Sequence, residues 1–144
     1  MATVTCFQDL EACKQARELV RAVYEITKTG PLAKDFELRN QMRDAAISSM
    51  SNIAEGFDRG GTREFIQFLS IAKGSAGEVE SDLYAAIDQQ YISTEQFEKV
   101  RARCLSVKRL VGGFMQYLQH TSRKGVKFNR SLAAEEEAPL QTDS

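Results

Sequence analysis

The stretch TREFIQFLSIAKGSAGEVESDLYAAID, residues 62–88, decides the fold. Its apolar side chains recur at alternating spacings of four and three residues, a heptad pattern that places them along one side of a helix. Thr62 is the expected N-cap, and Glu64 puts a negative charge in the first turn, where the helix dipole favours it. The pattern predicts a long helix over about 62–89 with a buried seam of Phe65, Leu69, Ala72, Ala76, Val79, Leu83 and Ala86.

The segment that follows predicts a second helix of the same kind, over about 93–120. Ser93 and Gln96 have the spacing of a capping box, and Ile92 and Phe97 have the spacing of a hydrophobic staple. Its apolar seam is expected to contain Phe97, Val100, Cys104, Val107, Val111, Phe114 and Leu118.

Two more helices are expected before residue 62, over about 7–28 and 35–55. Gly30-Pro31 should end the first, because proline cannot continue the hydrogen-bond ladder. Gly56 and Gly60-Gly61 should cap the second and turn the chain. The apolar positions predicted for these two helices are Leu10, Cys13, Val20, Val23, Tyr24, Phe36, Leu38, Met42, Ala46, Ser49 and Ile53. The expected fold is all-α, an antiparallel up-down four-helix bundle in one domain over residues 1–120.

Composition limits the class of protein. The chain has 144 residues and a formal net charge of -1, so bulk charge favours no nucleic-acid partner. Cys6, Cys13 and Cys104 form no CxxC pair, and no apolar run approaches the ~18 residues of a membrane span. We therefore expect a cytoplasmic protein with reduced thiols and no membrane contact. Residues 121–144, basic and then acidic, carry no core face and are expected to form a flexible tail.

Catalysis is not expected. Di-iron bundles use Glu-x-x-His pairs, whereas the single histidine, His120, has no carboxylate three residues before it. The serines near residue 50 have no histidine base, and Cys104 occupies a core position. We predict no enzyme activity, no metal and no cofactor.

Part of the chain resembles a known family. LRNQMRDAAISSMSNIAEGFDRGGTREFIQFLSIAKGSAGEVESDL, residues 38–83, is similar to the four-helix-bundle proteins encoded in intervening sequences of bacterial 23S ribosomal RNA genes. This family is also called the S23 ribosomal protein family, and the resemblance covers roughly residues 7–118. It implies a cytoplasmic bundle without established enzymatic activity, assembled as a ring-shaped homopentamer. A related protein, the accessory protein of diversity-generating retroelements, binds nucleic acid and a reverse transcriptase. Met50 stands where the family usually has proline, and the retroelement proteins are far more basic.

The polar residues around the helical hairpin are the first candidate site. In the expected register, Asn52 faces Ile66 and Gln67, Glu55 faces Arg63, and Arg43 faces Ser75. They form either interhelical bonds that fix the register or a polar groove for a partner. The candidate residues, some of them from the family motif, are Ser51, Asn52, Glu55, Gly56, Arg63 and Lys73.

Basic residues of the last predicted helix and the tail are the second candidate site. They form either a solvated surface or a weak phosphate-contacting strip. The candidate nucleic-acid contacts are Arg101, Lys108, Arg109, Arg123, Lys124, Lys127 and Arg130.

Surfaces for neighbouring subunits are also expected. Glycines inside the predicted helices, including Gly74, Gly77 and Gly112, indicate close packing within the chain or against another subunit. Apolar residues away from the seams remain available to neighbours: Ile66, Tyr84, Leu110, Met115 and Tyr117. Two functions fit: an oligomeric RNA- or ribosome-associated binding module, or an adaptor for a protein such as a reverse transcriptase.

Overall fold

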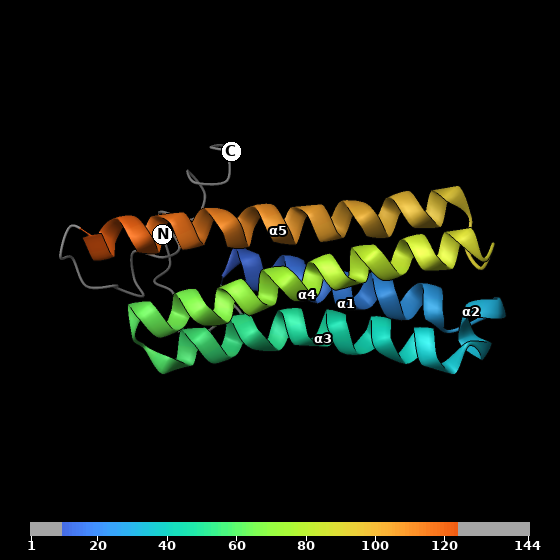
Figure 1. Ribbon diagram of the computed structural model, residues 1–144, viewed down its shortest axis with the longest axis horizontal. Helices are drawn as coiled ribbons and strands as arrows, with labels where there is room; N and C mark the ends of the chain where they lie inside the picture. The colour runs from blue at the N-terminus through green and yellow to red at the C-terminus, as the bar shows by residue number, and fades with distance from the viewer. Residues whose placement is uncertain (1–9, 124–144) are drawn as a thin grey trace.

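The computed structural model describes residues 10–123, and within this range it is helical without strands (Figure 1). Residues 1–9 and 124–144, which include most of the expected tail, lie outside the described range. The tail was predicted to begin at residue 121, which is three residues too early, because the last helix continues to Arg123. The helices are α1 Glu11–Thr27, α2 Gly30–Lys34, α3 Phe36–Arg59, α4 Thr62–Asp88 and α5 Thr94–Arg123.

The four long helices form the predicted antiparallel bundle. Consecutive long helices pack together, α1 on α3, α3 on α4 and α4 on α5, and α5 closes the circle against α1. Figure 1 shows α4 between α3 and α5, with α1 behind them. The prediction of an all-α four-helix bundle is therefore confirmed, with the short α2 added between α1 and α3.

The predicted end of the first helix, at about residue 28, is confirmed to within one residue, but the role predicted for Gly30-Pro31 was wrong. Helix α1 ends at Thr27, and Gly30-Pro31 begins α2 instead of ending α1. Gly30 has a φ of 76°, and Pro31 lies in the first turn of α2, where its missing N–H and fixed φ do no harm. Asp35 then caps α3, because its Oδ1 accepts a hydrogen bond of 3.1 Å from the Leu38 N–H.

Arg43 of α3 caps the C-terminus of α1. Its guanidinium donates to Thr27 Oγ1 at 2.8 Å and to the Thr27 carbonyl at 3.2 Å. The same group lies 4.4 Å from the ring centroid of Tyr24. A cation is favoured at this end of a helix, so Arg43 binds α1 and does not face Ser75 as predicted.

The turn between α3 and α4 lies later than predicted. Helix α3 continues through Gly56 to Arg59, and Gly60 provides the left-handed C-cap with a φ of 79°. Gly61, not Thr62, is the N-cap of α4. Gly56 is buried, and a Cβ there would lie 2.8 Å from Phe65 Cδ1 and 2.8 Å from Phe68 Cβ. Gly56 therefore allows α3 and α4 to approach closely and does not cap the helix.

The start of α5 confirms the predicted capping box. The Ser93 N–H donates to Gln96 Oε1 at 2.9 Å, and the Gln96 N–H donates to Ser93 Oγ at 3.1 Å. Ile92 and Phe97, the predicted staple, are both buried. The Tyr91 hydroxyl donates to Asp35 Oδ2 at 3.0 Å, which ties this loop to the start of α3.

The core follows the predicted seams of α4 and α5, whose members are all buried. In α3, Met42, Ala46, Ser49 and Ile53 are also buried as predicted. Phe36 was predicted wrongly, since 63% of it is exposed. Leu110 and Tyr117, expected to be available to neighbours, are instead buried in the chain's own core.

Candidate functional site

Asn52 forms its hydrogen bonds within α3. Its Nδ2 donates to the Ser48 carbonyl at 2.8 Å and to Ser48 Oγ at 3.0 Å. Exposed Ser51 likewise donates to the Ser48 carbonyl, at 3.4 Å. The predicted bonds from Asn52 to α4 or to the turn were therefore wrong. The Asn52 side-chain amide stabilises one turn of α3, and the outer surface of α3 is polar at this turn.

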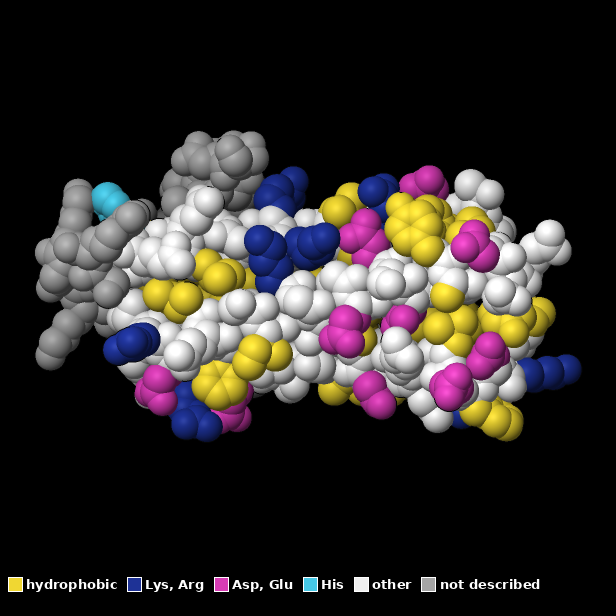
Figure 2. Space-filling model, viewed as in Figure 1, with side chains coloured by type: hydrophobic (Ala, Val, Ile, Leu, Met, Phe, Trp, Pro, Cys, Tyr) yellow, Lys and Arg dark blue, Asp and Glu magenta, His cyan; other side chains and the backbone are white. Residues whose placement is uncertain are grey.

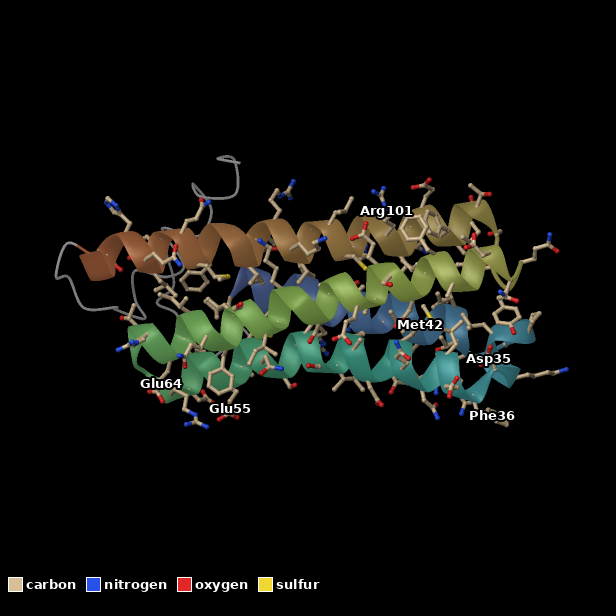
Figure 3. All side chains as sticks on the ribbon, in the orientation of Figure 1. Asp35, Phe36, Met42, Glu55, Glu64 and Arg101 are labelled. Carbon is tan, nitrogen blue, oxygen red and sulfur yellow. The ribbon has the colours of Figure 1, made fainter. Side chains whose placement is uncertain are left out.

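Glu55 pairs with Arg59 of the same helix at 3.0 Å, not with Arg63. Arg59 also lies 3.8 Å from Glu64 and 5.2 Å from the ring centroid of Phe68, both on α4. Figure 3 labels Glu55 and Glu64 near the α3–α4 turn. The Arg63 side chain is exposed. About half of each side chain in the Glu55–Arg59 pair is exposed, so the pair contributes at most about 1 kcal/mol.

Other polar residues hold α3 and α4 together. The hydroxyls of Ser48 and Ser75 lie 2.9 Å apart, and Ser49 Oγ donates to the Ala72 carbonyl at 3.0 Å. Gln41 Nε2 donates to Asp82 Oδ1 at 2.9 Å. Sequence reasoning missed this set because it placed the turn several residues too early. The sequence did carry one signal of these polar links, namely polar residues beside a heptad seam, such as Ser75 and Asp82.

Asp82 is a buried acid with only part of its hydrogen-bonding capacity used. Only 6% of the residue is exposed, and Oδ2 has no hydrogen-bond partner among the described residues. Burial and, to a smaller extent, the charge of Glu78 raise the pKa of Asp82 to about 6, although the hydrogen bond from Gln41 opposes the increase. Asp82 therefore titrates close to neutral pH.

Two candidate phosphate contacts, Arg101 and Lys108, bind a carboxylate of the protein itself. Arg101 Nε donates to Glu80 Oε2 and Lys108 Nζ donates to Glu80 Oε1, each at 3.1 Å. Burial alone would raise the pKa of Glu80, but the hydrogen bonds and charges of Lys108 and Arg101 lower it overall. Figure 3 labels Arg101 on α5 where that helix borders α4. This trio joins α4 to α5, and Glu80 offsets one of the two positive charges.

Lys73 and Arg109 are exposed and form no ion pair with another described residue. Lys73 extends from α4 to α5, where its Nζ lies 3.5 Å from the position that a Cβ on Gly112 would take. Arg109 precedes Gly112 by almost one turn of α5, so it lies within one helical turn of the point that Lys73 reaches. Figure 2 shows Lys and Arg side chains gathered near the middle of α4 and α5.

The structure does not describe the side chains of the remaining candidate phosphate contacts. Arg123 is the last residue of α5, and its side chain is not described. Lys124, Lys127 and Arg130 lie outside the described residues. Their role as nucleic-acid contacts stays a prediction.

The described residues offer little for catalysis. Between residues 10 and 123, no three His, Cys, Asp or Glu side chains are grouped so that they could hold a metal ion. Burial, followed by the charge of Glu80, raises the pKa of Cys104 to about 12, so its thiol stays protonated near neutral pH. His120 is exposed near the end of α5. None of the described helices is both long and apolar enough to cross a membrane.

These features define a helical bundle with a continuous apolar core and polar links between its helices. The model of the 23S rRNA-intervening sequence protein family matches residues 8–113, and the chain belongs to this family. The similar solved structures include a protein of unknown function from the S23 ribosomal protein family of Bacteroides thetaiotaomicron VPI-5482. The two are 23% identical with a TM-score of 0.67, and the match covers 73% of this chain and 98% of that one, which shows a shared fold. No curated protein matches the chain.

Proposed function

We propose that this protein is a non-enzymatic binding module that works through its helical surfaces and first through association with copies of itself. The observation that carries this proposal is the outward surface of α4, which has small and apolar residues that the described residues leave largely uncovered. We define the α4 face as Ser70, Ile71, Gly74, Gly77, Ser81 and Ala85.

The glycines of the α4 face support association. A Cβ on Gly74 or Gly77 would meet no atom within 4 Å, so packing inside the described chain does not explain either glycine. Each glycine costs the helix about 1 kcal/mol relative to alanine. Ile71, one turn before Gly74, is 52% exposed. Close approach of another helix would account for the glycines and cover Ile71.

A ring-shaped pentamer is our first assignment of the assembly, by similarity to the family. Cys104 is buried and forms no disulfide with another described residue, which supports a cytoplasmic location. The alternative partner for the α4 face is another helical protein, as in an adaptor for a reverse transcriptase.

We expect Gly74→Ala and Gly77→Ala to raise the thermal stability of the separated chain while weakening its assembly. Alanine favours the helix by about 1 kcal/mol, but its methyl group holds a neighbouring helix away. Light scattering across a dilution series measures the assembly, and circular dichroism measures the melting temperature. Gly112→Ala is the matched control, because a Cβ there would make only ordinary contact with Lys73 at 3.5 Å. A wild-type protein that is monomeric at micromolar concentration would reject the proposal.

A second function, binding of structured RNA such as ribosomal RNA, is supported by Lys73 and Arg109. These are cations from two different helices, within one helical turn of each other along the bundle, without a carboxylate partner among the described residues. Five copies in a ring would present the pair five times, and avidity would then strengthen weak contacts.

We expect Lys73→Ala and Arg109→Ala each to weaken binding to a ribosomal RNA fragment and to flatten its salt dependence by about 0.7–0.9 logarithmic units per contact. The matched control is Arg101→Ala, which removes a cation already bound to Glu80 and should mainly lower stability. Filter binding at several salt concentrations gives both quantities. An equal loss of affinity in the Arg101 variant would show that this pair is not the contact.

A further inference from the structure

A groove runs between α1 and α5, on a part of the bundle that the proposed function does not use. Its main hollow has a volume of about 380 Å³ and a floor of Ala22, Ile26 and Val100. An adjoining hollow of about 200 Å³ extends it toward Glu18 and Arg103. Glu25 and Lys99 line both parts, which makes them one surface feature, called here the α1/α5 groove.

Local structure keeps the groove open. Ala22 is a small side chain at the centre of the α1 wall, and it leaves space that a longer residue would fill. Gln96 also lines the hollow, but its side chain accepts the hydrogen bond from the Ser93 N–H and is held in the cap of α5. The opening therefore follows from an alanine on one helix and a capping box on the other.

Both walls of the groove carry charged side chains. The α1 wall contributes Glu18, Arg21 and Glu25, and the α5 wall contributes Glu95, Lys99 and Arg103. Glu18 forms an ion pair with Arg21 at 2.8 Å. Glu25, Lys99 and Arg103 form no ion pair with any described residue. The acid and the two bases line the same hollow without reaching one another, so a bound molecule could pair with both walls.

Lys99 and Arg103 are one helical turn apart and so lie on the same side of α5. Together they offer a point charge and a planar fork of donors, which suits a carboxylate. A polyanion fits poorly, because the carboxylate of Glu25, that of Glu18 and that of Glu95 at the edge of the main hollow repel it. A simple cation is repelled in turn by Lys99 and Arg103.

We propose that the α1/α5 groove binds a small zwitterion of the amino-acid or dipeptide class. The carboxylate pairs with Lys99 and Arg103, the ammonium group pairs with Glu25, and an apolar side chain lies on the floor of Ala22, Ile26 and Val100. The hollow lies at the lower end of the range of volumes found for small-molecule sites. The groove shares no residue with the α4 face or with Lys73 and Arg109, so this proposal stands or falls independently of the proposed function.

The test is a titration of the ¹⁵N-labelled full-length protein with the dipeptide Ala-Leu at low salt, followed by NMR. Shifts of backbone amide signals should be confined to the C-terminal half of α1 and the first turns of α5. The double variant Lys99→Ala, Arg103→Ala should weaken binding by about tenfold, since each exposed charge pair contributes modestly. N-acetyl-Ala-Leu and Ala-Leu amide, which lack one charge each, should both bind more weakly than Ala-Leu.

Arg109→Ala is the matched control, because it removes an exposed cation of α5 that does not line the groove, and it should leave the affinity unchanged. Circular dichroism should show that every variant remains folded, since the removed cations form no ion pair within the described chain. Absence of shifts at millimolar Ala-Leu would overturn the proposal. So would equal binding of the two capped dipeptides, or an affinity that the double variant does not change.

Discussion

Replacing Phe65 with alanine is expected to lower the free energy of unfolding by about 3–5 kcal/mol, as truncation of a buried aromatic side chain does. Phe65 is fully buried at the centre of an aromatic cluster. Its ring meets Phe57 edge-on at 6.1 Å and Phe114 at 5.1 Å between centroids. Alanine at this position would leave a cavity where α3, α4 and α5 meet. Urea denaturation followed by circular dichroism measures the change.

Phe36→Ala is the control, because Phe36 is also aromatic and helical but 63% exposed, and its loss should change the stability by about 0.5 kcal/mol or less. Gly56→Ala should cost about 1–3 kcal/mol in the wild-type protein, since its Cβ would overlap the Phe65 ring. In the Phe65→Ala background that cost should fall, although the contact with Phe68 Cβ remains. Additive effects of the two substitutions would contradict the close approach of α3 and α4 described above.

The elements that could be predicted from sequence are those that local patterns determine. The seam from Phe65 to Ala86 is buried at every position because a heptad spacing allows only one side of a helix to face a core. The Ser93–Gln96 capping box forms as predicted because both of its bonds lie within four residues. Neither feature depends on which helix is the neighbour.

The pairing of α3 with α4 could not be predicted so well, because it depends on which glycine forms the turn. Gly56 and Gly60 are both plausible caps from composition, but only Gly60 has the left-handed conformation. Placing the turn too early shifted every facing pair, so Ser75 was assigned to Arg43 instead of Ser48. The bonds predicted for Asn52 failed for a different, local reason. An amide one turn from Ser48 finds its partners inside its own helix.

The candidate phosphate contacts show a second limit of the sequence. Arg101 and Lys108 were grouped with Arg109 because they are basic and lie on one helix. Glu80 separates them, since it binds Arg101 and Lys108 from the neighbouring α4 and leaves Arg109 exposed. The basic residues of α5 can be identified from the sequence, but the sequence does not show which residues of a neighbouring helix pair with them. The α1/α5 groove was missed likewise, because its two walls are about seventy residues apart in sequence.

Asp82→Asn is expected to stabilise the protein near neutral pH by about 3 kcal/mol. The pKa of Asp82 is raised from 3.8 to about 6 in the folded chain, so between these values the folded state holds a proton that the unfolded state releases. Stability therefore falls as the pH rises through this window, and above it the buried charge destabilises the fold by a constant amount. Asparagine keeps an oxygen for the hydrogen bond from Gln41 and carries no charge.

The stabilisation by Asp82→Asn should almost vanish near pH 4, where Asp82 is protonated and neutral in the folded wild-type protein. Melting temperatures of both proteins between pH 4 and pH 8 give the difference as a function of pH, and the step should lie between the two pKa values. Asp44→Asn on the exposed side of α3 is the control for the loss of a carboxylate that is not buried. Two results would contradict the assignment: a gain independent of pH, or a loss of stability at pH 7. Either would mean that the Asp82 carboxylate has a compensating partner, because a charge held between α3 and α4 by Gln41 alone must weaken their packing.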